Sequence, residues 1–283
     1  MGRFKVDNQD YISHDSSEWS LLKSFMKIKI LVAAHKKFPM PNAEGYMPIL
    51  VGAAKNYKPG IEYQRDDEGE NISSKNPNYN ELTAVYWAWK NLKDVDAIGL
   101  VHYRRLFFDT KPHSLNNVLS KPKIEKLLSK YDVILPKKRN YYIESNYSHY
   151  IHAHHKEPLD KTREIIKKYY PQYLINFDKV MQRKKAHMFN MFIMRKVAFE
   201  SYCSFIFGVL EKVESQIDIS NYSVQEKRVF GYISELLMDV WLETNNFNAT
   251  EVKWEQLGGK KNFQKAVSLV ERKIGIKTKT HFN

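Results

Sequence analysis

The chain has 283 residues, of which 43% are hydrophobic and 27% charged, a composition that excludes collagen-like and wholly disordered proteins. Its 45 Lys and Arg against 32 Asp and Glu give a formal net charge of +13, so we expect an anionic partner: a nucleic acid, an acidic membrane or a phosphorylated small molecule. A single cysteine excludes a disulfide framework and a metal site of several cysteines.

The first residues carry no recognisable targeting segment. Residues 1–26 are polar and mixed, lack the apolar centre of a secretory signal, and predict an N-terminal arm. No apolar run in the chain approaches the ~20 residues that span a bilayer. We therefore expect a cytoplasmic protein with a folded domain over residues 27–255.

Short apolar runs alternate with helical patterns through the first half of the chain. Ile28–Ala34 and Tyr46–Val51 predict buried strands. Residues 55–78 are rich in Asn, Gly, Asp, Pro and Ser, which predicts a long loop. The alternation predicts an α/β sheet with parallel members. Further elements expected here are a helix over Tyr79–Asn91, a strand over Asp96–His102, a helix over Lys123–Lys130 and a strand over Tyr131–Pro136.

The second half is mostly helical, with a strand expected over Met188–Met194. A basic tail over 256–283 follows, in which apolar residues from Phe263 to Ile274 recur at helical spacing. That pattern is typical of a membrane-surface anchor, and equally of a helix packed on the domain with a solvated basic face. The helices expected before the tail are Asp160–Tyr170, Pro171–Gln182, Val197–Ile217 and Gln225–Asn245.

Basic residues follow two predicted strands. Ala34 and His35 end the first strand, and in open α/β sheets ligands bind outside the carboxyl ends of strands. His102-Tyr103-Arg104-Arg105 stands at the end of another, where arginine forks could bind phosphate. The alternatives are an exposed basic turn and a structural ion pair. Because side chains alternate along a strand, we expect one of Arg104 and Arg105 to face a ligand.

The polar loop before residue 79 is a third candidate site. Its Asn71 and Lys75 precede a helix N-terminus, which favours anions, and Asn side chains can bind a base or ribose. Glu81 lies three residues after Asn78, the spacing of a capping box, which gives it a structural alternative.

Two clusters in the second half complete the candidates. Arg228, Tyr232, Glu235 and Asp239 share one helix face, which is either solvated surface or a cleft wall with Glu235 as a general base. The histidines between positions 149 and 155 could suggest a metal site, but their spacing fits no strong zinc pattern and they have no cysteine partner, so we favour a polar loop on the acceptor side. They are His149, His152, His154 and His155.

Several of these stretches resemble a bacterial family of capsular and exopolysaccharide synthesis proteins, long catalogued as a domain of unknown function. That family is similar to GT-A-type glycosyltransferases, which use nucleotide-diphosphate sugars, and it includes galactofuranosyltransferases. The resemblance implies an α/β, GT-A-like (Rossmann-like) mixed sheet flanked by helices, with helical C-terminal additions. The matching segments are KILVAAHK (29–36), NISSKNPNYNELTAVYWAWKN (71–91), IGLVHYRRLF (98–107), YDVILPKKRNYYIE (131–144), HMFNMFIM (187–194) and RVFGYISELLMDVW (228–241).

The resemblance also implies where the substrates bind. The acceptor would be a glycan or a lipid-linked oligosaccharide in capsular, exopolysaccharide or O-antigen synthesis, at the inner face of the membrane. The implied donor-binding residues are Ala34, His35, Asn71, Lys75, His102, Tyr103, Arg104 and Arg105, and the acceptor-side residues are His187, Asn190, Arg228 and Tyr232.

The sequence departs from the GT-A pattern at the metal site. GT-A enzymes usually hold Mn or Mg through Asp-x-Asp at a strand end, whereas Asp94-Val-Asp96 stands at the start of its strand. We expect arginine to neutralise the leaving diphosphate instead, as a fixed charge placed where negative charge develops. Glu235, with Asp239 in reserve, would deprotonate the acceptor hydroxyl, and the configuration would invert.

Two other classes of protein remain open on the sequence. The basic charge and 13% aromatic content could serve RNA or single-stranded DNA, although the chain has no recognisable nucleic-acid module, so we expect no such partner. The chain could also be an inactive sugar-binding scaffold.

Overall fold

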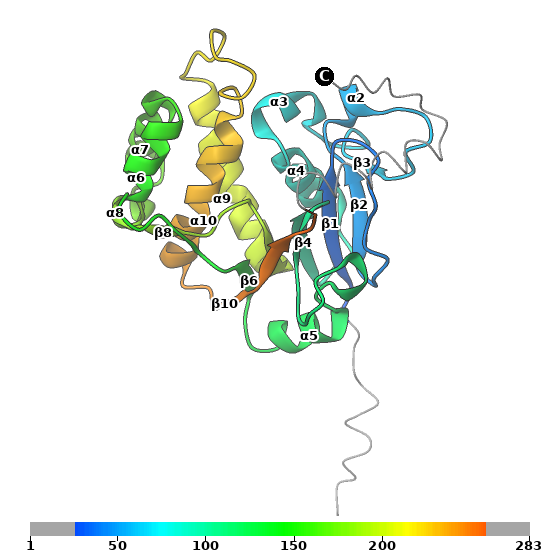
Figure 1. The fold of residues 1–283 in the computed structure, drawn as a ribbon. Coiled ribbons are helices and arrows are strands. Elements are labelled where there is room, and N and C mark those ends of the chain that lie inside the picture. The colour runs from blue at the N-terminus through cyan, green and yellow to red at the C-terminus, as the bar shows by residue number, and fades with distance from the viewer. Residues whose placement is uncertain (1–25, 259–283) are drawn as a thin grey trace, which may run out of the picture.

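A computed structural model describes residues 26–258, which fold around one mixed sheet of nine strands (Figure 1). The expected arm before Met26 and the tail beyond residue 258 lie outside the described residues. Seven strands follow the order β10 (Ala249–Val252), β6 (Val133–Pro136), β9 (Phe192–Arg195), β4 (Ala97–His102), β1 (Ile28–Ala34), β2 (Tyr46–Leu50) and β3 (Gln64–Arg65). The other two, β5 (Arg105–Phe107) and β11 (Trp254–Gln256), extend the sheet from β4, while β7 (Arg139–Asn140) and β8 (Lys185–Ala186) pair separately.

Strand pairing gathers three strand ends at one edge of the sheet. β1 pairs in parallel with β2 and β4, and β9 lies antiparallel between β4 and β6. β6 therefore runs in the same direction as β4, and the carboxyl ends of β1, β4 and β6 open at the same edge. The predicted mixed α/β sheet flanked by helices is confirmed.

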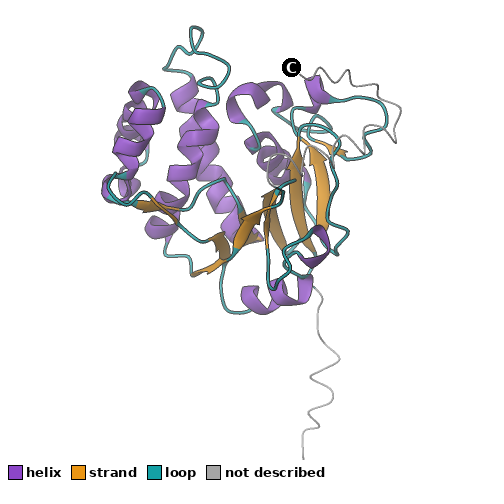
Figure 2. Cartoon of the chain, viewed as in Figure 1, coloured by secondary structure: helices purple, strands orange, loops and turns teal. Residues whose placement is uncertain are grey.

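Helices cover the two faces of the sheet unequally (Figure 2). The larger apolar core packs one face against α4 (Leu82–Asn91), α9 (Lys196–Glu214) and α10 (Val229–Asn245), and the smaller core joins the other face to α5 (Lys121–Leu128). Leu31 and Ala33 enter the larger core and Ile30 and Val32 the smaller, as strand alternation requires. The remaining helices are α2 (Ala53–Asn56), α3 (Asn76–Tyr79), α6 (Asn146–Ala153), α7 (Lys156–Tyr169) and α8 (Leu174–Gln182), with short 3-10 turns at Ser73–Lys75, Leu115–Asn117 and Pro171–Tyr173.

The helix expected from Gln225 begins only at Val229, and the one expected from Pro171 begins as a 3-10 turn. Three further differences concern segments near the candidate site residues. The helix expected over Tyr79–Asn91 is interrupted at Asn80, whose φ is 52°, and forms α3 and α4. The strand expected from Met188 begins only at β9, because Phe189 and Asn190 have φ values of 74° and 53°. Of the histidines expected in a loop, His149 and His152 lie on α6, which begins where the Ser145 side chain caps it, and His154 and His155 connect α6 to α7. Within residues 26–258, no helix has the length and apolar character to cross a membrane.

Candidate active site

A cavity of about 390 Å³ opens at the carboxyl edge of the sheet. Its walls come from the end of β1, the turn between β4 and β5, the break between α3 and α4, the loop before β9, and α10. It lies where ligands bind in open α/β sheets. The residues that line it are Ala33, Ala34, His35, Val51, Asn76, Asn80, Glu81, His102, Tyr103, Arg104, Arg105, Phe189, Arg228 and Glu235.

The turn between β4 and β5 brings two arginines to this cavity. His102 ends β4 and pairs directly with Arg105, the first residue of β5, so Tyr103 and Arg104 form a tight turn. Both arginines line the cavity, because strand alternation stops at the turn. The expectation that one of them faces a ligand stays a prediction. The Arg105 guanidinium lies 4.6 Å from the ring centre of Phe189.

A third arginine is held by the break between α3 and α4. Asn80 has a positive φ, and its side chain lies toward the start of α10, where its Oδ1 accepts a hydrogen bond from Nε of Arg228 at 2.8 Å. A Cβ on Gly231 would stand 2.2 Å from Nδ2 of Asn80, so only glycine permits this approach. Arg228 is thus fixed at the cavity wall.

Glu81 belongs to the cavity and not to a capping box. It occupies the N-cap position of α4, and its side chain makes no capping hydrogen bond. Its Oε1 instead accepts from Nδ2 of Asn190 at 2.7 Å, while Oδ1 of Asn190 accepts from Ser234 on α10 at 2.8 Å. The carboxylate is therefore held beside the cavity by a buried amide.

Glu235 is the second carboxylate of the cavity. Burial, followed by the negative charge of Glu81, raises its pKa to about 8, against the opposing effects of the Phe189 backbone, Arg105 and Arg228. A carboxyl whose pKa lies near neutrality can take up and release a proton at physiological pH. Two carboxyl groups and three guanidinium groups thus share one cavity.

Both histidines of the cavity favour their neutral form. Burial lowers the pKa of His102 most, and Nε2 of its ring donates to the Phe189 carbonyl at 2.6 Å. Burial also lowers the pKa of His35, together with the nearby charges of Lys36 and Arg104. The positive charge of the cavity therefore comes from its arginines.

Two predicted donor residues lie outside the cavity lining. Asn71 bonds to its own loop, donating to the Asp67 and Gly69 carbonyls. Lys75 pairs with Glu214 on α9 at 2.7 Å. The loop itself is organised by the buried carboxylate of Asp66, which accepts from the backbones of Gly52 and Ala53 and from the hydroxyls of Ser73 and Thr83.

The remaining candidates on α10 and on the acceptor side, which are Asp239, His187 and Tyr232, lie outside the cavity lining. Asp239 and His187 are buried together outside the cavity lining, with 2.5 Å between Oδ1 of Asp239 and Nδ1 of His187. Burial would raise the pKa of Asp239, but the hydrogen bonds and charge of His187 keep it below its ordinary value. Tyr232 stacks on His154 and lies beside Arg228, whose guanidinium is 5.6 Å from the Tyr232 ring centre.

Three of the four histidines between positions 149 and 155 form hydrogen bonds with carboxylates. Glu144 accepts from Nδ1 of His149 at 2.8 Å and from Nδ1 of His152 at 2.6 Å. His155 bonds to Glu226 at 3.0 Å. In residues 26–258 no three His, Cys, Asp or Glu side chains are grouped to hold a metal ion.

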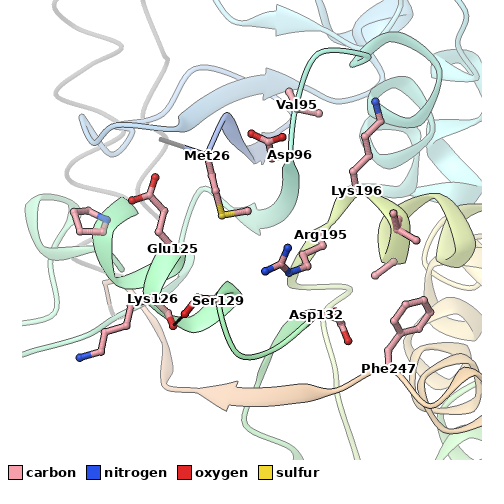
Figure 3. Close-up of a pocket in the computed structure, with 13 residues that line it drawn as sticks. Met26, Val95, Asp96, Glu125, Lys126, Ser129, Asp132, Arg195, Lys196 and Phe247 are labelled. Carbon is pink, nitrogen blue, oxygen red and sulfur yellow. Dashed lines mark hydrogen bonds between the residues drawn. The ribbon is translucent and has the colours of Figure 1, made fainter. Parts of the chain in front are cut away.

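A larger cavity, of about 1180 Å³, lies at the opposite edge of the sheet (Figure 3). Two of its charged side chains bond to the backbone: Arg195 donates to the Leu128 carbonyl at 2.9 Å, and Asp96 accepts from the Lys27 backbone at 2.7 Å. Asp94 pairs with Lys27 at 2.6 Å. Asp94-Val-Asp96 therefore lies at the edge of the sheet opposite the smaller cavity.

Several cavity residues were not predicted as ligand contacts. The break before Glu81 could have been suspected from Asn80, because Asn adopts a positive φ more often than most residues. Val51, Asn76 and Phe189 reach the cavity through tertiary packing alone, and nothing in their local sequence indicates it.

The comparisons with known proteins agree with this architecture. The family model described as "Domain of unknown function (DUF4422)" matches residues 29–246. The chain is also similar to the apo structure of WbbM, a bifunctional glycosyltransferase, with 30% sequence identity and a TM-score of 0.75. That match covers 82% of this chain and 46% of that chain, so this chain spans less than half of its length. No curated protein matches the sequence.

Proposed function

The chain belongs to the DUF4422 family, and we propose that it transfers a sugar from a nucleotide-diphosphate sugar to a glycan acceptor. The similarity to a glycosyltransferase at 30% identity supports this proposal, as does a cavity that combines arginines with carboxyl groups. Glycosyl transfer needs both: cations where the diphosphate leaves, and a base for the attacking hydroxyl.

We assign the diphosphate of the donor to Arg104, Arg105 and Arg228. Guanidinium groups bind phosphate oxygens through paired hydrogen bonds and keep their charge when partly buried. A divalent cation does not fit the same place, because three guanidinium groups would repel it. Of the two carboxyl groups that could bind it, Glu81 is held by Asn190 and Glu235 favours its protonated form. No step of the reaction is therefore assigned to a metal.

Glu235 is the proposed general base. It accepts the proton of the acceptor hydroxyl while the hydroxyl oxygen attacks the anomeric carbon and the bond from that carbon to the diphosphate oxygen breaks. The nucleoside diphosphate leaves toward the arginines, and the configuration at the anomeric carbon inverts. Positioning of donor and acceptor in one cavity supplies much of the rate.

The finer assignment extends from the sequence resemblance. Galactofuranose is the first donor sugar to test, and the acceptor would be a glycan or lipid-linked oligosaccharide of capsular, exopolysaccharide or O-antigen synthesis. The stacked pair of His154 and Tyr232, 4.0 Å between ring centres, lies next to Arg228 and suits an acceptor sugar, whose C–H groups pack on aromatic rings and whose hydroxyls bond to polar ones.

One observation supports the proposal most strongly: Arg104, Arg105 and Glu235 line the same cavity. The test is release of nucleoside diphosphate from a panel of nucleotide sugars, with and without glycan acceptors. Glu235→Gln should lower turnover at least about 100-fold, whereas Glu164→Gln on the exposed face of α7 should leave it unchanged. Binding of the sugars without turnover would indicate a scaffold protein, and near-normal turnover by Glu235→Gln would remove this residue from the mechanism.

A further inference from the structure

The ribbon formed by β7 and β8 concentrates exposed positive charge. We define the basic ribbon as Lys137, Lys138, Arg139, Lys184 and Lys185, all within two short chain segments that pair at Asn140 and Lys185. All but the half-buried Lys138 are exposed. Within residues 26–258, none of the five side chains forms an ion pair with a carboxylate, whereas the neighbouring Arg183 pairs with Glu243. No carboxylate within residues 26–258 therefore pairs with the charges of this surface.

Two large apolar side chains project from the end of the same ribbon. Tyr142 is 77% exposed and Ile143 is 87% exposed, and we call these two residues the apolar tip. The tip is held in a defined turn: Tyr142 has a φ of 59°, and its backbone N–H donates to Asn140 at 2.9 Å. The chain is anchored again by Asn146, which donates to the Val180 carbonyl at 2.8 Å. The turn thus presents two neighbouring apolar side chains to water in a fixed position.

We propose that the basic ribbon and the apolar tip dock on an anionic lipid bilayer. Lys and Arg near a membrane surface are attracted by acidic headgroups, and an aromatic and a branched aliphatic side chain gain by entering the interface. A soluble polyanion would satisfy the lysines but leave Tyr142 and Ile143 in water. The two features together therefore fit a lipid surface better than an acidic polymer.

The basic ribbon is joined on both sides to segments that lie at the cavity. Lys137 directly follows β6, whose carboxyl end opens at the same edge of the sheet as the cavity. On the other side, the chain runs from β8 through His187 to Phe189 in the cavity wall. Docking would bring the cavity to the headgroup region. The membrane contact itself does not depend on the proposed glycosyl transfer.

The test is flotation of the full chain with vesicles of phosphatidylcholine, with or without 30 mol% phosphatidylglycerol (roughly the anionic content that gives an appreciable surface potential). The wild-type chain should bind only the anionic vesicles. Removing the charge of the ribbon with Lys137→Gln, Arg139→Gln, Lys184→Gln and Lys185→Gln together should weaken binding at least about 10-fold. The matched control replaces the exposed Lys55, Lys58, Lys130 and Lys167 by Gln and should change binding less than about 3-fold.

A second measurement examines the tip. The one cysteine, Cys203, is fully buried, so Ile143→Cys can be labelled selectively with a polarity-sensitive dye. Its emission should shift to the blue with anionic vesicles, and that of Val197→Cys, exposed at the opposite edge of the sheet, should not. Equal losses in the ribbon and control variants, or an unchanged Ile143 label, would overturn the proposal. Ribbon-dependent binding to soluble polyphosphate without vesicle binding would assign the surface to a polyanion instead. None of these measurements uses a sugar donor, so their failure leaves the proposed function standing.

Discussion

Asn190 donates a hydrogen bond from Nδ2 to Oε1 of Glu81 at 2.7 Å, across 109 positions of sequence. The same Nδ2 donates to the Gly231 carbonyl at 3.1 Å. One buried amide therefore ties the loop before β9 to α4 and to α10. It also fixes the carboxylate of Glu81 where its charge acts on Glu235.

The pH dependence of activity should follow Glu235. Its pKa is raised from 4.5 to about 8, and the base must be ionised to accept a proton. We expect kcat/KM to rise about tenfold per pH unit up to about pH 8 and to level off above it. The profile of nucleoside diphosphate release between pH 5.5 and 9.5 measures this. A flat profile across that range would contradict the assignment.

Asn190→Ala should shift that profile. Without the amide, Glu81 is free to turn away, so its charge acts less on Glu235 and the apparent pKa in kcat/KM should fall below that of the wild type. The lost hydrogen bonds should also lower the free energy of unfolding by about 1–3 kcal/mol. Asn176→Ala, which removes only a bond to Thr244, is the matched control. A stability loss with an unchanged profile would leave Asn190 a purely structural residue.

Glu235→Gln should stabilise the protein at alkaline pH. Because the folded-state pKa of Glu235 lies above its unfolded value of 4.5, its contribution to stability is fully present below about pH 4.5 and is lost as the pH rises through about 8. Glutamine removes that loss. Allowing for partial solvent exposure, we expect a gain of about 2 kcal/mol at pH 9, or roughly 5 °C in Tm, and little gain at pH 5. Thermal unfolding at both pH values gives the comparison, and an equal effect at both would contradict it.

Asp239→Asn should separate stability from catalysis. The Asp239 carboxylate bonds to both the ring and the backbone N–H of buried His187, so its loss should cost about 2–4 kcal/mol of unfolding free energy. Because Asp239 does not line the cavity, turnover per folded molecule should stay within about threefold of the wild type. Denaturant titration and kinetics on the same preparation measure both quantities. A turnover loss as large as that of Glu235→Gln would return Asp239 to the list of bases.

The sequence was informative where local pattern decides structure. β1 from Ile30 onward and β4 are apolar runs, and such runs are buried strands because both faces of the sheet are covered. Their basic ends could be placed at one edge from parallel pairing alone. The helix face with Arg228 and Glu235 also followed from periodicity, and both residues line the cavity.

Other parts of the site depend on contacts that no local pattern records. The capping-box spacing of Glu81 gave a wrong prediction. Asn80 has a positive φ and bonds to Arg228 at the start of α10, so a new helix begins after Glu81. The turn at Tyr103 and Arg104 was not predicted, because no glycine marks this two-residue turn between two short strands. Lys75 looked like a donor contact, since its partner Glu214 lies 139 positions away.

The most direct test of the diphosphate assignment is calorimetric titration of nucleoside diphosphates and their sugars in the presence of EDTA. The wild-type chain should bind at least one of them, and the double variant Arg104→Ala, Arg105→Ala should bind it at least about 30-fold more weakly. Arg163→Ala, which removes an exposed pair with Asp178, should bind as the wild type does. Binding that requires added manganese, or that survives the loss of both arginines, would contradict the account.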